Sequence, residues 1–245
     1  MRRLERHRRL GVDLPPSKYL VTAICPTYNR KRFIPSAIAC FLSQTLLDSE
    51  LLIVDDGTES VVDLIPENPR IRYVRLEGPR RTTGAKRNSC CELAQGNIIV
   101  HWDDDDWSAP GRLENQVSQL WLSEKQVIVY YNILYWHKNT NMLYRYYPKV
   151  GPRHAYTWEY ANGASLCYYK SWWKQHRFGD IMVGEDSDFI KTAEVAGQMA
   201  TSDACKFMVI RAHGNNTCST AQWAGSPEIP LVNQNEIPLE FKGYQ

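Results

Sequence analysis

The stretch that decides the fold runs Gly96-Asn97-Ile98-Ile99-Val100-His101-Trp102-Asp103-Asp104-Asp105-Asp106-Trp107. Its β-branched run, Ile98 to Val100, predicts a short buried strand, and four consecutive aspartates follow. Adjacent carboxylates repel one another, and burying them costs free energy unless a cation or hydrogen-bond donors lie close by. A divalent metal, Mg²⁺ or Mn²⁺, with open positions for a substrate diphosphate is the simplest compensation. A solvated acidic loop that caps a helix near Pro110 is the alternative.

Length and composition indicate a soluble globular protein with one large α/β domain or two small ones. The chain has 245 residues, of which 43% are hydrophobic and 23% charged, and its formal net charge is +2. This balance gives no sign of a nucleic-acid partner. Five arginines nevertheless crowd the N-terminus, at positions 2, 3, 6, 8 and 9. We expect residues 1–18 to form a flexible basic head, with a weak contact to an anionic membrane as the alternative.

The sequence also bears on the compartment. No apolar run approaches the ~20 residues that span a bilayer, and no signal-peptide core follows the arginines. The seven cysteines lack C-x-x-C spacing, and several lie inside apolar segments. This pattern favours reduced core thiols over a disulfide framework or a zinc site. We therefore expect a cytoplasmic protein, peripheral to a membrane if the arginines bind one.

Strands and helices are expected to alternate through the first half of the chain. Apolar, β-branched runs predict strands at residues 19–25, 51–54, 71–75 and 98–103. Helices are expected between them, at residues 34–42, 61–65 and 84–94. Such alternation is typical of a parallel, doubly wound sheet, whose ligands bind beyond the carboxyl ends of the strands. Tyr28, Asp56 and the four aspartates fall on that edge, so one crevice is expected to hold a nucleotide and its metal.

The second half of the chain has shorter elements and more aromatic residues. Further elements are expected there: strands at 126–131, 163–169 and 207–211, a hairpin at 132–147 and a helix at 184–196. No repeat or linker divides the chain. We therefore expect one domain at 19–213, with a nucleotide-binding half at 19–110 and an acceptor half at 111–213. A polar C-terminal tail, 214–245, follows it.

Five motifs occur in order, each at a strand end or a helix start. They are Pro26-Thr-Tyr-Asn-Arg30, Asp55-Asp56-Gly57, Gly84 to Asn88, Asp103 to Asp106, and Gly184-Glu185-Asp186. Each motif alone is common, but this order over most of residues 19–213 resembles the family 2 glycosyltransferases. The resemblance implies a GT-A fold: a Rossmann-like, mostly parallel sheet flanked by helices, with a smaller mixed sheet on the acceptor side. It also implies inverting transfer of a sugar from a nucleotide diphosphate, with a UDP-sugar favoured, to a hydroxyl of a glycan or glycoconjugate.

The resemblance assigns the nucleotide end of the site. It implies that Tyr28 stacks against the nucleobase, while Pro26 and Thr27 shape that end of the pocket. Asp56 would accept a hydrogen bond from the base imide, which favours uracil or thymine. Asn88 is predicted to belong to the nucleotide site as well. Lys86 and Arg87 stand at the start of the helix that carries it, where a cation together with helix N–H groups could steady the diphosphate or the donor sugar; exposed helix charges are the alternative.

The acidic run would supply the family's DXD motif, Asp103-x-Asp105. Asp104 would lie by the ribose, and Asp105 would hold the Mn²⁺ or Mg²⁺ that bridges the phosphates. His213 would be a further metal ligand. Because the run has a fourth aspartate, the sequence leaves open whether Asp104 or Asp106 takes the position by the ribose.

Asp186 matches the family's catalytic aspartate, which takes the proton of the acceptor hydroxyl as general base. Glu185 and Trp158 are candidate acceptor contacts. The alternative role for Glu185 is that of a charge that complements the helix dipole. Most of the aromatic residues of this half are expected to pack in the core.

Two other functions compete with this interpretation. A nucleotidyltransferase would use similar carboxylates, but we would expect a glycine-rich, basic loop after the first strand, where Pro26-Thr-Tyr-Asn29 stands instead. A non-catalytic nucleotide-sugar-binding module would not need the base. Asp103, Asp105 and Asp186 together favour an enzyme.

Overall fold

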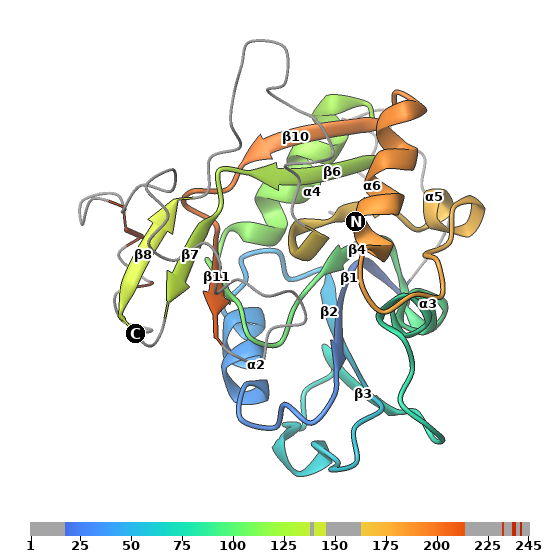
Figure 1. The fold of residues 1–245 in the computed structure, drawn as a ribbon, viewed down its shortest axis with the longest axis vertical. Helices are drawn as coiled ribbons and strands as arrows, with labels where there is room; N and C mark the ends of the chain where they lie inside the picture. The colour runs from blue at the N-terminus through green and yellow to red at the C-terminus, as the bar shows by residue number, and fades with distance from the viewer. Residues whose placement is uncertain are drawn as a thin grey trace.

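The structure is a computed structural model, and it describes residues 18–137, 140–145, 163–213, 232, 237–238 and 241. Two sheets organise these residues (Figure 1). The strands are β1 (Tyr19–Thr27), β2 (Ser49–Asp55), β3 (Ile71–Arg75), β4 (Gly96–His101), β5 (Trp107–Ser108), β6 (Val127–Tyr131), β7 (Leu134–His137), β8 (Met142–Arg145), β9 (Cys167–Tyr169), β10 (Met199–Asp203) and β11 (Met208–Ala212). The helices are α2 (Ile34–Leu42), η1 (Val62–Leu64), α3 (Thr83–Leu93), α4 (Arg112–Ser123), η3 (Gly163–Ser165), α5 (Lys170–Gln175) and α6 (Glu185–Val195).

The main sheet has seven strands in the order β10-β6-β9-β4-β1-β2-β3. β1 pairs in parallel with β2 and β4, β2 with β3, and β6 with β10. Only β9 runs antiparallel to its neighbours β4 and β6. Each residue of β2 is buried, as expected for a central strand covered on both faces. The predicted mostly parallel α/β sheet is therefore confirmed.

Helices cover both faces of this sheet, and the alternation of side chains along each strand divides the core into two clusters. On β2, Leu51 and Ile53 point to the cluster that includes residues of α2 and α4. Leu52 and Val54 point to the opposite cluster, which includes residues of α3, α5 and α6. The result is three layers with the sheet in the middle (Figure 1).

A second sheet, in the order β5-β11-β7-β8, lies beside the first. β7 and β8 form the predicted hairpin, in which Asn141 takes a positive φ of 53°. β5 follows the acidic run directly and pairs with β11, which leads to His213. This pairing brings two segments that are separated by about a hundred residues in the sequence, the acidic run and the segment around His213, close together.

Two element boundaries differ from those expected, and one strand was not predicted. β4 ends at His101, so the strand stops before the aspartates, and the turn that follows lies at Asp104 and Asp105. The strand expected at 163–169 is extended only from Cys167, because Gly163–Ser165 form the 3-10 helix η3. β10 was not predicted, since its sequence Met199-Ala-Thr-Ser-Asp203 is neither apolar nor alternating.

Among the described residues, no helix is long and apolar enough to cross a membrane. The basic head and Trp158 lie outside those residues, so the predicted membrane contact stays a prediction. Most of the predicted tail also lies outside them. Phe241 is an exception: it is fully buried and packs edge-on against Trp107 and Trp136.

Candidate active site

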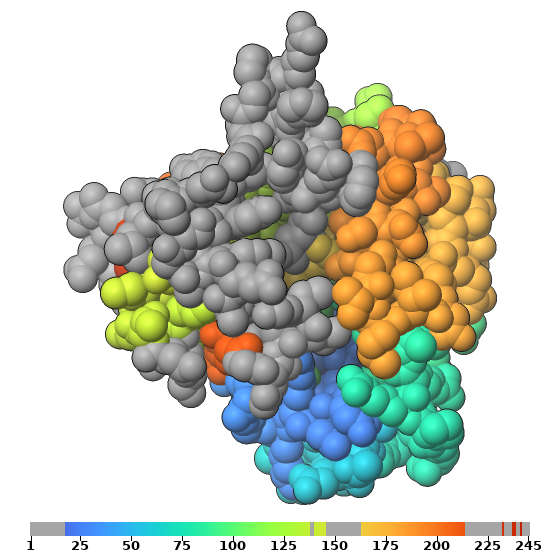
Figure 2. Space-filling view, in the orientation of Figure 1, coloured from blue at the N-terminus to red at the C-terminus, as the bar shows by residue number. Residues whose placement is uncertain are grey.

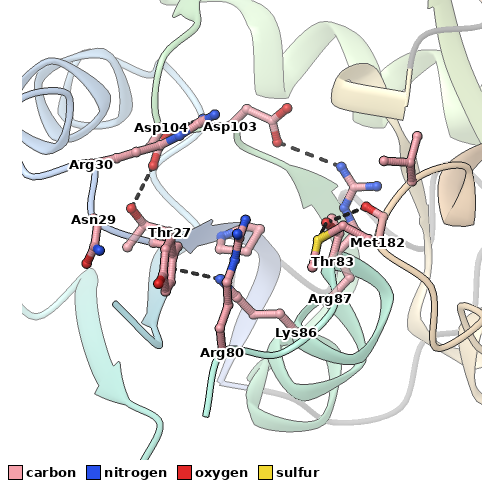
Figure 3. A pocket seen from close by; sticks show the side chains of 13 residues that line it. Thr27, Asn29, Arg30, Arg80, Thr83, Lys86, Arg87, Asp103, Asp104 and Met182 are labelled. Atoms are coloured by element: carbon pink, nitrogen blue, oxygen red, sulfur yellow. Dashed lines mark hydrogen bonds and ion pairs between the residues drawn. The ribbon is translucent and has the colours of Figure 1, made fainter. Parts of the chain in front are cut away.

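A pocket of about 500 Å³ lies at the carboxyl ends of β1 and β4 (Figure 3). Its wall comes from residues 26–30 after β1, from the start of α3, from the acidic turn and from the segment before α6. On the surface, that segment, coloured orange, meets the teal segment at the start of α3 (Figure 2). Backbone contacts hold the two together, because Gly84 N donates to Ile181 O at 3.1 Å and Thr83 Oγ1 to Met182 O at 2.8 Å.

The acidic turn is buried and is balanced by donors from the end of β1. Asp104 accepts from Thr27 Oγ1 at 2.6 Å and from Arg30 Nη1 at 3.0 Å. The same guanidinium nitrogen lies 2.8 Å from Asp105 Oδ2. Burial and the neighbouring Asp105 raise the pKa of Asp104 to about 7, and Arg30 opposes that rise. Arg30 was not predicted as a site residue, although it closes the Pro26-Thr-Tyr-Asn-Arg30 motif.

Asp106 is turned away from the pocket. It is 4% exposed and accepts a hydrogen bond from the backbone N of Arg211, on β11, at 3.1 Å. Burial, Asp105 and Asp103 raise its pKa well above the ordinary range. Asp103 and Asp104, by contrast, line the pocket. Of the two residues left open by the sequence, the structure therefore brings Asp104 to the pocket.

Asp105 and His213 form the pair that could hold a metal. His213 Nε2 lies 3.0 Å from Asp105 Oδ2, and the His213 ring stacks on Phe33 with 5.0 Å between ring centroids. Burial alone would raise the pKa of Asp105, but the His213 hydrogen bond and the Arg30 charge hold it below its usual value. Within the described part of the chain, no group of three or more histidine, cysteine or acidic side chains could hold a metal ion. A carboxylate and an imidazole fit Mn²⁺ or Mg²⁺ whose remaining positions are filled by diphosphate oxygens and water.

At the other end of the pocket, Tyr28 lies between two cations. The Arg80 guanidinium is 4.3 Å and the Lys86 ammonium 5.6 Å from the centre of its ring. Lys86 turns toward the sheet, where it forms an ion pair with Asp56 and donates to Thr27 O at 3.0 Å. The second carboxylate oxygen of Asp56 accepts from Arg81 N at 2.7 Å. The buried Lys86 is thus no exposed helix charge, and it lies at the Tyr28 end of the pocket.

Asn88 was predicted at the nucleotide site, but it is not among the pocket residues. Its amide oxygen accepts from Trp173 Nε1 at 2.9 Å and from Phe178 N at 3.1 Å. Its amide nitrogen donates to Phe178 O at 2.8 Å. Asn88 therefore ties α3 to the segment that follows α5, because its side chain points away from the pocket.

Arg87 joins the acidic turn to the start of α6 (Figure 3). It is 5% exposed and pairs with Glu185, which is 3% exposed. Its nitrogens also lie 3.8 Å from Asp186 Oδ2 and 4.0 Å from Asp103 Oδ1. Burial would lower the pKa of Arg87, but Glu185, Asp186 and Asp103 raise it. One buried guanidinium therefore sets the distance between the two acidic segments, and Glu185 faces it.

Asp186 has a far more accessible side chain than its neighbour Glu185. Its side chain is 28% exposed, and its Oδ1 accepts from the backbone N of Ser187 at 2.8 Å in the first turn of α6. A carboxylate with this exposure can accept a proton from a bound molecule. Asp186 itself is not among the residues that line the pocket, whereas Met182 and Val183, which the sequence gave no reason to select, do line it.

Known proteins resemble this chain in sequence and in fold. The family model described as Glycosyl transferase family 2 matches residues 22–178. The Escherichia coli UDP-Glc:alpha-D-GlcNAc-diphosphoundecaprenol beta-1,3-glucosyltransferase WfgD is 33% identical over 107 residues, which are 42% of this chain and 41% of that protein. The Escherichia coli (strain K12) putative colanic acid biosynthesis glycosyl transferase WcaA is 34% identical over 121 residues, 47% of this chain and 41% of that protein. The matches thus cover about two fifths of the length of these relatives.

Solved structures share the fold. The S. aureus TarS 1-349 structure in complex with UDP-GlcNAc has a TM-score of 0.66 at 17% identity, over 80% of this chain and 60% of that chain. The mannosyltransferase PcManGT from Pyrobaculum calidifontis, in complex with GDP-Man and Mn2+, has a TM-score of 0.62 at 18% identity, over 87% of this chain and 64% of that chain.

Proposed function

We propose that this chain, which belongs to glycosyl transferase family 2, is an inverting, metal-dependent glycosyltransferase. It transfers a sugar from a UDP-sugar to a hydroxyl of a carbohydrate or glycoconjugate. The observation that carries this proposal is the position of Arg87, which lines the pocket together with Asp103 and lies 4.0 Å from Asp103 Oδ1 and 3.8 Å from Asp186 Oδ2. The donor and the proton acceptor would then lie within reach of one another, as a transfer reaction requires.

The nucleotide would bind at the Tyr28 end of the pocket. Tyr28 offers a ring face for stacking, and the buried Asp56 and Lys86 offer an acceptor and a donor to the base edge. The imide of uracil presents one N–H between two carbonyls, so it suits such a pair. One structural neighbour, TarS, is solved in complex with UDP and with UDP-GlcNAc, and another, PcManGT, in complex with GDP-Man, which makes the base the first property to measure.

Asp105 and His213 would hold the divalent metal, and Asp104 would lie by the ribose. When bound, the metal neutralises negative charge that develops on the departing diphosphate. Arg30 contacts the same carboxylate of Asp105, so it limits the charge that the metal has to balance.

Asp186 would act as the general base. As the acceptor oxygen attacks the anomeric carbon, its proton passes to the Asp186 carboxylate. The bond from the anomeric carbon to the diphosphate oxygen breaks on the opposite face, so the anomeric configuration inverts. Glu185 would act through Arg87 in this scheme, since the two are paired in the interior.

Calorimetric titration of UDP, GDP and dTDP, each with Mn²⁺ and with EDTA, tests the donor site. We expect UDP to bind in the presence of Mn²⁺ and expect Asp105→Ala to abolish that binding. Asp63→Ala is the matched control, because Asp63 lies on the surface in an ion pair with Lys31. Failure of all three diphosphates to bind under any condition would contradict the proposal.

Turnover distinguishes the enzyme from a binding module. With UDP-sugars as donors, Asp186→Asn should keep UDP binding and lose turnover by at least about 100-fold, the usual contribution of a general base. A wild-type protein that binds UDP and turns over no UDP-sugar with any acceptor, water included, would favour the binding module.

A further inference from the structure

Gly163, the first residue of η3, lies directly against the carboxyl group of Asp186. A Cβ atom placed on Gly163 would overlap the Asp186 carboxylate and would lie 2.5 Å from Asp186 Cβ. Real Cβ atoms essentially never approach other atoms within 3.0 Å. Gly163 is also absent from the glycines with positive φ. The position therefore requires glycine for space, because the backbone conformation itself is open to other residues.

η3 is held from behind and has little freedom to move away from Asp186. Its three carbonyl groups each accept a hydrogen bond from a buried side chain. His101 Nδ1 lies 2.7 Å from Gly163 O, Arg112 Nη2 3.0 Å from Ala164 O, and Gln116 Nε2 2.6 Å from Ser165 O. His101 and Arg112 are each 1% exposed, and Gln116 is 0% exposed. Shifting η3 would break hydrogen bonds of groups that have no water to replace them.

The other side of Asp186 leaves it more freedom. Its side chain is 28% exposed, and the Arg87 nitrogen nearest to it is 3.8 Å away. Its neighbour Glu185, by contrast, is fixed by the ion pair with Arg87. A side chain added at residue 163 would therefore displace the whole Asp186 side chain, from its Cβ to its carboxylate, rather than the η3 backbone.

We propose that Gly163 is a positioning residue for the reaction: the missing side chain leaves the space that the Asp186 carboxylate occupies when it accepts the acceptor's proton. The inference rests on the proposed function, in which Asp186 is the base. His101, Arg112 and Gln116 fix the wall of that space. The sequence Asn162-Gly163-Ala164 gave no sign of this role.

Hydrolysis of UDP-glucose by the full chain, with water as acceptor and Mn²⁺ present, tests the effect on chemistry. We expect Gly163→Ala to lower kcat about 100-fold, as a displacement of about 1 Å does. The Kd for UDP, measured by calorimetry, should stay within about twofold of that of the wild type. Added to Asp186→Asn, the same change should cost little more turnover, since both act through one carboxylate. Gly111→Ala is the matched control, because its Cβ would lie 3.6 Å from Phe207, an ordinary contact.

A stability cycle tests the contact itself and does not depend on UDP-glucose being the donor. The urea midpoints of wild type, Gly163→Ala, Asp186→Gly and the double variant are compared. We expect Gly163→Ala to lower the midpoint in the wild-type background but not in the Asp186→Gly background, because removal of the whole Asp186 side chain, Cβ included, makes room for the methyl group. The proposal is overturned if Gly163→Ala turns over within about twofold of an active wild type, or if its loss of stability persists in the double variant. A wild type that neither binds UDP nor turns over UDP-glucose would instead refute the proposed function.

Discussion

Arg30 brings a positive charge into the acidic turn, where Asp104 and Asp105 would otherwise face one another across a buried space. Burial lowers the pKa of a guanidinium, but the two aspartates raise that of Arg30 above its ordinary value. The turn therefore carries its own counter-ion from the end of β1. This balance was not predicted, because residues 30 and 105 are far apart in the sequence and only the parallel pairing of β1 with β4 brings them together.

His101 is the residue from which we expect a distinct pH dependence of stability. Its ring is buried, with Nδ1 bonded to Gly163 O and Nε2 3.3 Å from the Tyr168 hydroxyl. The carbonyl can only accept, so Nδ1 carries a proton. Burial, Arg87 and Arg112 hold its pKa well below 6.5.

The unfolded chain takes up a proton at this histidine as the pH falls through about 6.5, whereas the folded protein does not. The free energy of unfolding should therefore fall as the pH drops below 6.5, by at most about 1.4 kcal/mol per pH unit from this group. Carboxyl groups with a raised pKa, such as Asp104, act in the opposite direction. The quantity to measure is therefore the difference between wild type and His101→Asn in urea unfolding at pH 7.5 and 5.5. We expect the variant to lose less stability than the wild type on acidification, and parallel pH dependences would contradict a neutral buried ring.

At the scale of elements, the contact between α3 and α6 depends on one side chain. Arg87 leaves α3 and reaches Glu185 and Asp186 at the start of α6, with Asp103 4.0 Å away. We expect Arg87→Lys to lower UDP-sugar turnover by about 100-fold, because one ammonium cannot reproduce a planar group that spans three carboxylates. Steady-state kinetics, together with urea unfolding, measures this loss.

The control is Arg177→Lys, which changes the other Arg–Glu pair between α3 and the second half of the chain. Arg177 and Glu92 are both about half exposed, so their pair contributes little to stability or activity. Equal effects of the two Arg→Lys changes would mean that Arg87 acts only as a surface charge does. A loss of stability without a loss of turnover would mean that its contact with Glu185 is structural alone.

The sequence predicted those strands whose apolar composition shows that they are buried. β1, β2 and β3 begin or end within about two residues of the expected positions, because continuous apolar runs need a sheet covered on both faces. β10 escaped prediction, since it is partly exposed and pairs with a single neighbour, β6. The predicted site residues Tyr28, Asp103 and Asp104 do line one pocket. The contacts of Asn88 and Glu185 could not be predicted from their motifs, because their partners Phe178 and Arg87 lie about a hundred positions away.

For the whole molecule, the two core clusters enclose thiols that the sequence predicted to be reduced and buried. Cys25, Cys90, Cys91 and Cys167 are fully buried and free, and burial raises the pKa of each. They belong to β1, α3 and β9, so they become accessible only when the main sheet opens. We expect these four of the seven cysteines to react with Ellman's reagent in the native protein only at the rate of that opening, whereas all seven react at once in urea.

Ligand binding at the pocket then links the site to the whole fold. A ligand that binds only the folded state adds about 2.7 kcal/mol of stability at a concentration of 100 Kd. UDP with Mn²⁺ at that concentration should therefore slow the reaction of the four buried thiols about 100-fold, if they are exposed by global unfolding. Asp105→Ala should remove this protection while the labelling rate without ligand remains measurable as a reference. Protection of the same size in Asp105→Ala would show that nucleotide binding does not depend on Asp105. A labelling rate that does not change when UDP is added to the wild type would show that these thiols are exposed by a local opening away from the pocket.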